Sequence, residues 1–271
     1  MKKLISMILV LTFVLCTGLT ALADASTIEG YSHQVGTWET IEGGVKATPT
    51  NAAQHLMLKK TIKEGTVEFK MSGDALGHDS NPGLYFKGTN IDKVTETGHW
   101  GTGSIESGKM EGGIAGLGYY MIYFANDEVN LCNMYNGGWN GRHAFKNITT
   151  LLNDNGAWKT AGIDVKVEFN EAGAVKIYIN NVLAIDYAPA EGEAYPTGGQ
   201  IALRAVNSKN NPDNADADEV KTINYTNVKV TAPATSSPET GDNTVVVASI
   251  VVLTALCAGA VITYSKKRVV A

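Results

Sequence analysis

Hydrophobic residues recur at every second position through most of the chain between its two apolar ends. The clearest runs are residues 66–71 (TVEFKM), 163–169 (IDVKVEF) and 175–179 (VKIYI). A period of two places one face of a β-strand in a core and the other face in water. No segment keeps a helical period of 3.6 residues over three turns. The pattern therefore predicts a succession of short β-strands.

Turn residues separate these runs. The sequence Asn170–Gly173 joins two of the runs, and Asn180–Asn181 predicts a tight hairpin between residues 175–179 and 182–187. Further strands are expected at residues 37–41, 45–48, 56–62, 83–87, 119–124, 129–135, 200–206 and 222–230. About a dozen short strands without an internal repeat predict an all-β antiparallel sandwich or barrel, and argue against a propeller or a solenoid.

Two glycine-rich segments interrupt the strand pattern. Residues 89–118 include His99 and Trp100, and residues 136–143 (NGGWNGRH) include Trp139 and Arg142. Long connections in compact domains are commonly functional or mobile. Both segments are therefore predicted to be exposed loops that could carry a binding site.

The first 23 residues have the order of a secretory signal peptide. Lys2 and Lys3 precede an apolar run at residues 4–15, and Ala21-Leu22-Ala23 supplies a small-x-small cleavage site. The alternative is a retained membrane anchor, but the run is shorter than the roughly 20 residues that a spanning helix needs. The chain is predicted to be exported and cleaved.

The other end resembles the cell-wall sorting signal of Gram-positive surface proteins. Residues 237–241 (SPETG) look like its Leu-Pro-x-Thr-Gly pentapeptide, and an apolar run at residues 244–264 and a basic stretch at residues 266–268 follow. In that family a sortase cuts between the threonine and the glycine and joins the threonine to peptidoglycan. The resemblance therefore implies cleavage between Thr240 and Gly241, although Ser237 replaces the usual leucine. A plain C-terminal membrane anchor is the alternative.

These segments predict four regions. They are a signal peptide (1–23), a β-sandwich domain (24–231), a spacer with the sorting motif (232–241), and a membrane span with a basic tail (242–271). Both interpretations of the C-terminal end place the domain outside the cell, and the sorting signal places it on the wall of a Gram-positive bacterium.

Composition narrows the function. The 271 residues carry a net charge of −5, and residues 24–240 carry 17 Lys and Arg minus 26 Asp and Glu, or −9. So acidic a surface excludes a nucleic-acid partner and favours neutral ligands or cations. Of the three cysteines, only Cys132 lies in the domain, so the domain has no internal disulfide and its stability must come from core burial.

A succession of motifs resembles one structural family. The motifs are Trp38 before Gly43-Gly44, then residues 65–69 (GTVEF), 82–86 (PGLYF), 119–123 (YYMIY), 176–186 (KIYINNVLAID), 198–203 (GGQIAL) and 228–230 (VKV). Their order is similar to concanavalin A-like lectin/glucanase jelly rolls, especially the branch of laminin-G-like domains and levan-binding carbohydrate-binding modules. The resemblance covers residues 34–231 and implies a concanavalin A-like β-sandwich that binds a glycan.

The candidate carbohydrate-binding residues are aromatic and polar. An indole can stack on the apolar CH face of a sugar, and Arg and Asn can bond its hydroxyl groups, which favours Trp139 with Asn140 and Arg142, and also Trp100. The alternative is that each tryptophan caps the end of the sandwich, and Trp38 and Trp158 are expected in strand-like runs of the core.

Two tyrosines are further candidates. Tyr85 and Tyr120 alternate with apolar neighbours, so one or both could face the sheet on which the resembled superfamily binds glycans. A core tyrosine whose hydroxyl bonds the backbone is the alternative for each.

Carboxylates bear on catalysis. Glucanases of the resembled superfamily carry Glu-x-Asp-x-x-Glu on one strand, and the nearest stretch here is Glu128-Val-Asn130-Leu-Cys-Asn133. An amide cannot exchange a proton as the two carboxylates of a glycosidase do. A non-catalytic binding module is therefore expected, and a glycoside hydrolase with an atypical carboxylate pair is an alternative.

A metal is the one cofactor that the sequence suggests. Asp213, Asp216 and Asp218 in the acidic segment 207–219 could hold calcium, which takes six to eight oxygen ligands. The alternative is a solvated acidic loop, and the lack of His-x-x-x-His spacing argues against zinc.

Together these features predict a wall-anchored extracellular protein that captures or adheres to a polysaccharide or host glycan. Its expected partners are the glycan, the sortase and, after anchoring, peptidoglycan, with membrane contact only through the C-terminal segment. An adhesin for a host protein is the alternative, and would expose an apolar patch over several strands.

Overall fold

The computed structural model describes residues 28–49, 54–78, 80–94, 97–98, 101–102, 116–135, 138–206 and 221–233. All of them except Pro233 belong to one compact unit, Met1–Ala232. The predicted signal peptide, the sorting motif with Thr240 and Gly241, and the predicted membrane span lie outside the described residues. In the part of the chain that is described, no helix has the length and apolar character needed to cross a membrane.

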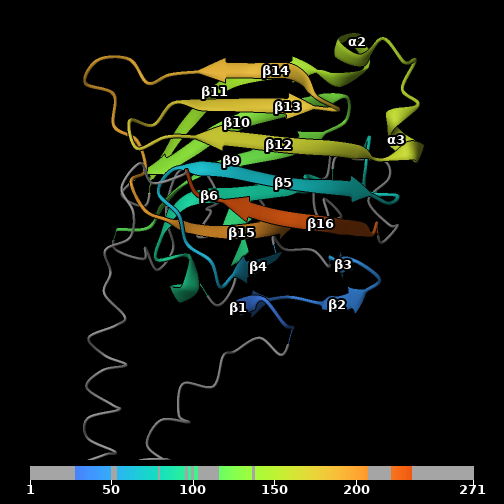
Figure 1. The fold of residues 1–271 in the computed structure, drawn as a ribbon, viewed down its shortest axis with the longest axis horizontal. Helices are drawn as coiled ribbons and strands as arrows, with labels where there is room; N and C mark the ends of the chain where they lie inside the picture. Colours follow the sequence, from blue (N-terminus) through green and yellow to red (C-terminus); the bar gives the residue numbers. More distant parts are fainter. Residues whose placement is uncertain are drawn as a thin grey trace, which may run out of the picture. The chain divides into compact units, whose positions relative to one another are not determined.

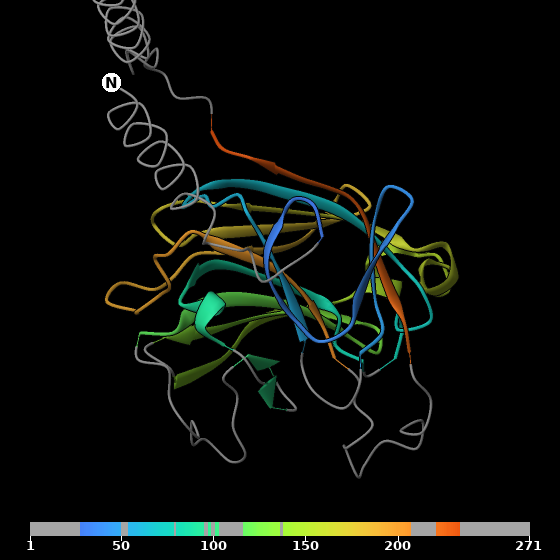
Figure 2. The same ribbon diagram turned by 90° about the horizontal axis from the view of Figure 1, so that it is seen from below.

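Two seven-stranded antiparallel sheets lie face to face (Figures 1 and 2). The first sheet has the spatial order β1 (Tyr31–Val35), β4 (Gln54–Leu58), β15 (Gln200–Ala205), β6 (Gly83–Thr89), β9 (Gly118–Ala125), β10 (Glu128–Tyr135) and β11 (Gly138–Asn147). The second sheet has the order β14 (Val182–Tyr187), β13 (Val175–Ile179), β12 (Ile163–Phe169), β5 (Gly65–Ser72), β16 (Ile223–Thr231), β3 (Gly44–Ala47) and β2 (Trp38–Ile41). The predicted all-β antiparallel sandwich is confirmed.

The core fills the space between the sheets. In the second sheet, inward residues alternate with outward ones as the sequence predicts: Val67, Phe69 and Met71 of β5 are buried, and residues between them are only half-buried. They pack with inward residues of the first sheet, such as Leu84 and Ile122, in one apolar cluster. Side chains from both inner faces thus form the continuous core typical of a β-sandwich.

The two predicted turns of the second sheet are confirmed. Asn180 and Asn181, between β13 and β14, have φ of 48° and 66°, the left-handed values that a type I′ hairpin needs at both central positions. Between β12 and β13, the Asn170 side chain accepts a hydrogen bond from Ala174 N at 3.0 Å, and Gly173 has φ of 84°. These local contacts fix the register of three neighbouring strands.

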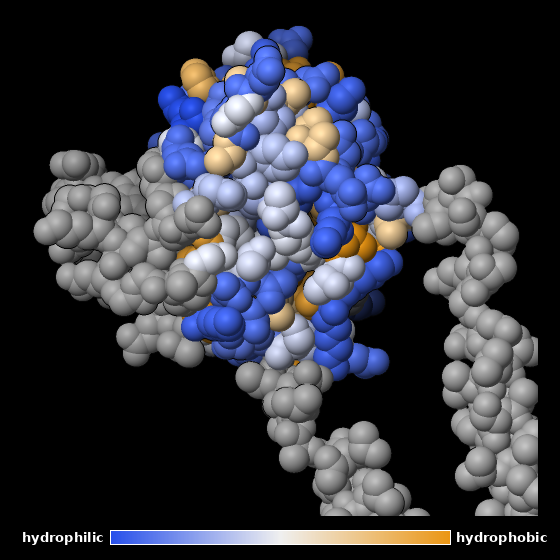
Figure 3. All heavy atoms as spheres, turned by 90° about the vertical axis from the view of Figure 1, so that its left-hand side faces the viewer, coloured by the Kyte–Doolittle hydropathy of each residue, from blue (hydrophilic) through white to orange (hydrophobic). Residues whose placement is uncertain are grey.

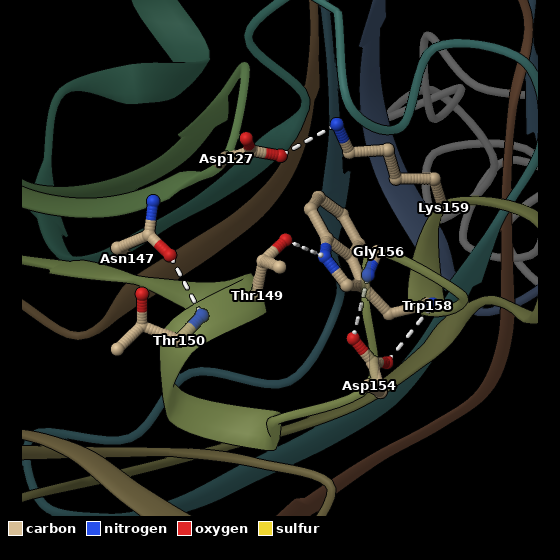
Figure 4. Close-up of polar contacts among 8 residues, drawn as sticks. All are labelled: Asp127, Asn147, Thr149, Thr150, Asp154, Gly156, Trp158 and Lys159. Carbon is tan, nitrogen blue, oxygen red and sulfur yellow. Dashed lines mark hydrogen bonds and ion pairs between the residues drawn. The ribbon is translucent and has the colours of Figure 1, made fainter.

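A short helical corner, α2 (Ile148–Leu152) and α3 (Trp158–Ala161), connects the two sheets between β11 and β12 (Figure 4). Trp158 is buried, as predicted. It begins the helix α3, so the prediction that it lies in a strand-like run is wrong. The Asp154 carboxylate accepts hydrogen bonds from the backbone N–H groups of Gly156 and Trp158, each at 3.0 Å. The Trp158 indole N–H donates to Thr149 Oγ1 at 3.1 Å. One-turn helices are too short to leave a 3.6-residue pattern in the sequence.

The two predicted loops have different outcomes. Of residues 89–118, the structure describes the 3-10 helix η1 (Ile91–Lys93) and a two-stranded pair, β7 (Thr97–Gly98) and β8 (Gly101–Thr102). The prediction that residues 136–143 are a loop is wrong, because Gly138–Asn147 forms β11 at the edge of the first sheet. Its pairing with β10 shifts twice, and Gly141 has φ of 98°. Such bulges disrupt alternation and hide the strand in the sequence.

Polar side chains cross-link the sheets, and Lys87 and Tyr225 are two of them. Lys87 of β6 is buried, and its Nζ donates to the carbonyl oxygens of Lys63 (3.1 Å), Asn170 (2.7 Å) and Glu171 (3.4 Å). The Tyr225 hydroxyl of β16 accepts a hydrogen bond from Gly83 N at 2.9 Å and donates to the Arg204 carbonyl. Lys87 reaches from the first sheet to the second, and Tyr225 reaches from the second sheet to the first. Together they fix the position of one sheet on the other.

Candidate functional site

The outer face of the first sheet carries a second apolar cluster. Its buried members are Met57, Tyr85, Ile91, Val94, Leu117, Tyr119, Met121, Cys132, Met134 and Ala202. The first sheet is therefore buried on both faces over much of its width. Burial raises the pKa of the Cys132 thiol to about 12, so this residue is an inert apolar side chain rather than a reactive thiol.

The outer face of the second sheet is different. Its charged side chains pair with one another: Lys166 with Glu168 at 2.8 Å, and Lys229 with Glu68 at 3.5 Å. The Lys166 ammonium also lies 4.0 Å from the centre of the Tyr178 ring. Exposed pairs of this kind contribute little to stability and keep a surface solvated. The two outer faces are therefore chemically distinct, and the unusual one belongs to the first sheet.

Strand register places six residues in one line across the outer face of the first sheet. Arg204 pairs with both His55 and Gly83, Tyr123 pairs with both Gly83 and Asn130, and Asn130 pairs with Phe145. We call His55, Arg204, Gly83, Tyr123, Asn130 and Phe145 the polar row. The row spans six adjacent strands, which at about 4.8 Å per step is on the order of 24 Å.

The half of the row on β4, β15 and β6 is buried. The Arg204 Nε donates to the Tyr85 hydroxyl at 2.9 Å, and its Nη1 donates to the Asn81 carbonyl. His55 is fully buried, and neither ring nitrogen has a hydrogen-bond partner among the described residues. Desolvation, with a smaller effect of nearby His33, lowers the His55 pKa to about 3, so its ring is neutral.

The other half of the row becomes more exposed toward the sheet edge: Asn130 is buried, Tyr123 is half-buried and Phe145 is exposed. Phe145 is 53% exposed, and the Arg142 guanidinium carbon lies 4.2 Å from the centre of its ring. Arg142 Nη1 donates to Asn130 Oδ1 at 3.0 Å and to Glu128 Oε2 at 3.3 Å. We call Glu128, Asn130, Arg142 and Phe145 the β10–β11 cluster. It holds a planar cation over an exposed ring, between a carboxylate and an amide.

The structure brings some of the predicted site residues to this cluster. Arg142 belongs to it, and Asn140 is exposed on the same strand. Trp139 pairs through its backbone with Met134, and its side chain lies outside the described part. Tyr85 lies on the outer face of the first sheet but is fully buried.

The remaining predicted residues lie elsewhere. Tyr120 points into the core between the sheets, and its hydroxyl donates to the Gly173 carbonyl at 3.1 Å. This is the alternative given for it in the sequence analysis, a core tyrosine whose hydroxyl bonds the backbone. Burial raises the Tyr120 pKa, so its hydroxyl stays protonated. Trp100 and the predicted calcium ligands Asp213, Asp216 and Asp218 fall outside the described residues.

Sequence reasoning missed Phe145 and Tyr123 as site residues. Phe145 lies two positions beyond the segment predicted to be a loop. Tyr123 lies in β9, and nearly all the other residues of this strand are buried. The signal that could have revealed Phe145 is the i, i+3 spacing to Arg142 across a bulge. That signal has meaning only once β11 is known to be a strand.

The carboxylates of the first sheet are few. Among its seven described strands, Glu128 is the one Asp or Glu residue. The β9–β10 register runs without a shift, and Val129 and Leu131 face the core, so Asn133 also faces inward. Within the described residues, no group of three or more His, Cys, Asp or Glu side chains is arranged to hold a metal ion.

Known proteins resemble this chain in structure and not in sequence. No protein-family model and no curated protein sequence matches the chain. Among solved structures, the apo Crh5 transglycosylase has a TM-score of 0.51 at 11% identity, over 78% of this chain and 83% of that one.

Two bacterial structures are somewhat less similar. The carbohydrate-binding module CBM66 from Bacillus subtilis has a TM-score of 0.46 at 15% identity, over 73% of this chain and 92% of that one. A β-glucanase from Bacillus licheniformis has a TM-score of 0.49 at 12% identity, over 76% and 88%. With its two antiparallel seven-stranded sheets, the chain has the concanavalin A-like jelly-roll fold.

Proposed function

We propose that this protein binds a carbohydrate through the β10–β11 cluster and does so without catalysing its cleavage. The observation that carries the proposal is the exposed Phe145 ring beneath the Arg142 guanidinium, with Asn130 and Glu128 beside it. An exposed ring accepts the apolar CH face of a sugar, and the adjacent donors and acceptors bond its hydroxyl groups. A fold of this kind supports both binding and catalysis, so the site must carry the argument.

The exposed surface favours a sugar over a protein partner. Among the described residues, the exposed large hydrophobic side chains are Phe145, Val182 and Leu183. The side of the molecule seen in Figure 3 is mostly hydrophilic in its described part, with apolar residues in small separate patches. A protein-binding adhesin needs a broad apolar patch. Single exposed rings among polar groups suit a sugar ring better.

The cluster also supports binding rather than hydrolysis. Glycoside hydrolysis needs two carboxyl groups on either side of the scissile bond. The Glu128 carboxylate accepts a hydrogen bond from Arg142. Asn130 and Asn133 occupy the two positions at which the glucanase pattern Glu-x-Asp-x-x-Glu has its second and third carboxylates. A hydrolase would have to draw its second carboxylate from outside the strands of the first sheet.

A glycan array probed with the full-length chain tests this function, with calcium and then with a chelator. Replacing Phe145 by Ala should abolish array binding, whereas Val182→Ala, which also truncates an exposed apolar side chain, should leave it intact. Intact binding in Phe145→Ala would refute the site. A folded chain that binds no glycan would refute carbohydrate binding, and loss of binding in chelator would support calcium at Asp213, Asp216 and Asp218.

We also propose that the protein is displayed on the cell wall. The support is the order of signal peptide, pentapeptide, apolar run and basic tail in the sequence. A sortase would cut between Thr240 and Gly241 and join the chain to peptidoglycan. Release of the protein by a peptidoglycan hydrolase, but not by detergent, is the expected result. Release by detergent alone would indicate a plain membrane anchor.

A further inference from the structure

Glu128 and Arg142 form an exposed donor–acceptor unit. Their side chains are 36% and 44% exposed, and the carboxylate and guanidinium approach to 3.3 Å. Asn130 bonds the same Nη1 atom at 3.0 Å, and the Phe145 ring lies 4.2 Å from the guanidinium carbon. The guanidinium is thus held by an amide at its edge and a ring at its face. Its orientation toward a ligand is largely set before binding.

The two groups have complementary hydrogen-bonding capacity. A carboxylate only accepts hydrogen bonds, and a guanidinium only donates them. A sugar hydroxyl does both, so one hydroxyl can donate to Glu128 while its neighbour on the ring accepts from Arg142. Hydrogen bonds to ionised partners are roughly twice as strong as neutral ones. The pair therefore matches two neighbouring hydroxyl groups.

Charge discriminates against other ligands. The Glu128–Arg142 pair sums to zero, so binding a neutral ligand leaves no charge uncompensated. A ligand carboxylate or sulfate that approached Arg142 would also meet Glu128, and the whole chain carries −5. A cationic sugar at Glu128 would meet Arg142 in the same way.

We infer that the ligand of the β10–β11 cluster is a neutral saccharide, bound by two neighbouring ring hydroxyls between Glu128 and Arg142, with its CH face on the part of the Phe145 ring that Arg142 leaves exposed. The inference rests on the proposed carbohydrate binding and specifies its chemical class. Loss of the Glu128 charge should weaken binding of the neutral sugar and remove the barrier to acidic ones.

The test uses the full-length chain and two sets of probes. The first set is the neutral glycans of the array. The second is a polyuronic acid together with the same polymer after its carboxylates have been reduced to primary alcohols. Glu128→Gln is compared with Glu168→Gln, which removes the carboxylate of a similar Lys–Glu pair beside an aromatic ring on the other sheet. Urea unfolding confirms that each variant is folded, and Arg142→Gln provides a second change in the same pair.

We expect the wild type to bind neutral glycans and not the polyuronic acid. Glu128→Gln and Arg142→Gln should each weaken neutral binding by about tenfold or more, the equivalent of one hydrogen bond to an ionised group. Glu128→Gln should also gain binding to the acidic polymer, and Glu168→Gln should change neither. Preferential binding of acidic glycans by the wild type, or unchanged neutral binding in Glu128→Gln, would refute the inference while leaving carbohydrate binding in place. No binding to any glycan would refute both.

Discussion

His55 makes the stability of this protein sensitive to acid. Its ring is fully buried on β4 beside Arg204 of the polar row, and neither nitrogen has a hydrogen-bond partner among the described residues. Burial lowers the pKa in the folded state from 6.5 to about 3. Between these two values the unfolded chain binds a proton at this site and the folded chain does not. The free energy of unfolding is therefore highest above pH 6.5 and falls as the pH drops toward 3.

The size of the effect follows from the two pKa values. A proton bound only by the unfolded state lowers the free energy of unfolding by about 1.4 kcal/mol for each pH unit below 6.5. Lowering the pH from 7.5 to 5.0 should therefore reduce the free energy of unfolding by about 2 kcal/mol through His55 alone. Leucine has a similar volume and no proton to bind. The pH dependence of His55→Leu should be flatter by this amount.

Urea unfolding of both proteins at pH 7.5 and 5.0 measures the difference. Carboxylates and other histidines titrate in both proteins, so they cancel in the comparison. At pH 7.5, His55→Leu should be as stable as the wild type or more stable, because it removes two buried ring nitrogens that have no hydrogen-bond partner among the residues described. Equal losses of stability on acidification in the two proteins would show that His55 is solvated or bonded in solution, and would refute the reasoning.

Three further substitutions test other contacts. Lys87→Met removes the ammonium that bonds three backbone carbonyls, and should lower the urea unfolding free energy by about 3 kcal/mol. Tyr225→Phe removes the hydroxyl link to Gly83 N and should cost about 1–3 kcal/mol, whereas an unchanged midpoint would mean that water replaces the link. Asp154→Ala removes two hydrogen bonds at the start of α3 and should cost about 1–2 kcal/mol, which thermal unfolding would detect.

The sequence predicts the second sheet better than the first for a physical reason. Strands of the second sheet bury one face only, so β12 and β13 alternate cleanly between buried and less buried residues. In the first sheet, β4 is buried at every position and β6 at nearly every position. Alternation is lost where both faces are covered. β1 is half-buried at four of its five positions and carries no alternating apolar pattern, so the sequence does not predict it.

The candidate site was only partly predictable. Arg142 and Asn140 were recognised from residue type alone, but as members of a loop. The polar row joins residues 55, 83, 123, 130, 145 and 204, which come from six strands and share no local spacing. Such a row depends on the register between strands, and a bulge of one residue would turn Phe145 to the other face.

The place of β16 in the second sheet determines how the domain would respond to a pulling force. β16 is the last strand of the described residues, and it lies between β5 and β3 rather than at an edge. A load applied beyond Thr231 and directed along the strand would act on hydrogen bonds to both neighbours at once, in shear. Tyr225 would pass part of this load to the first sheet through Gly83. The domain should therefore resist extension from its C-terminal end more strongly than one whose last strand could peel from an edge.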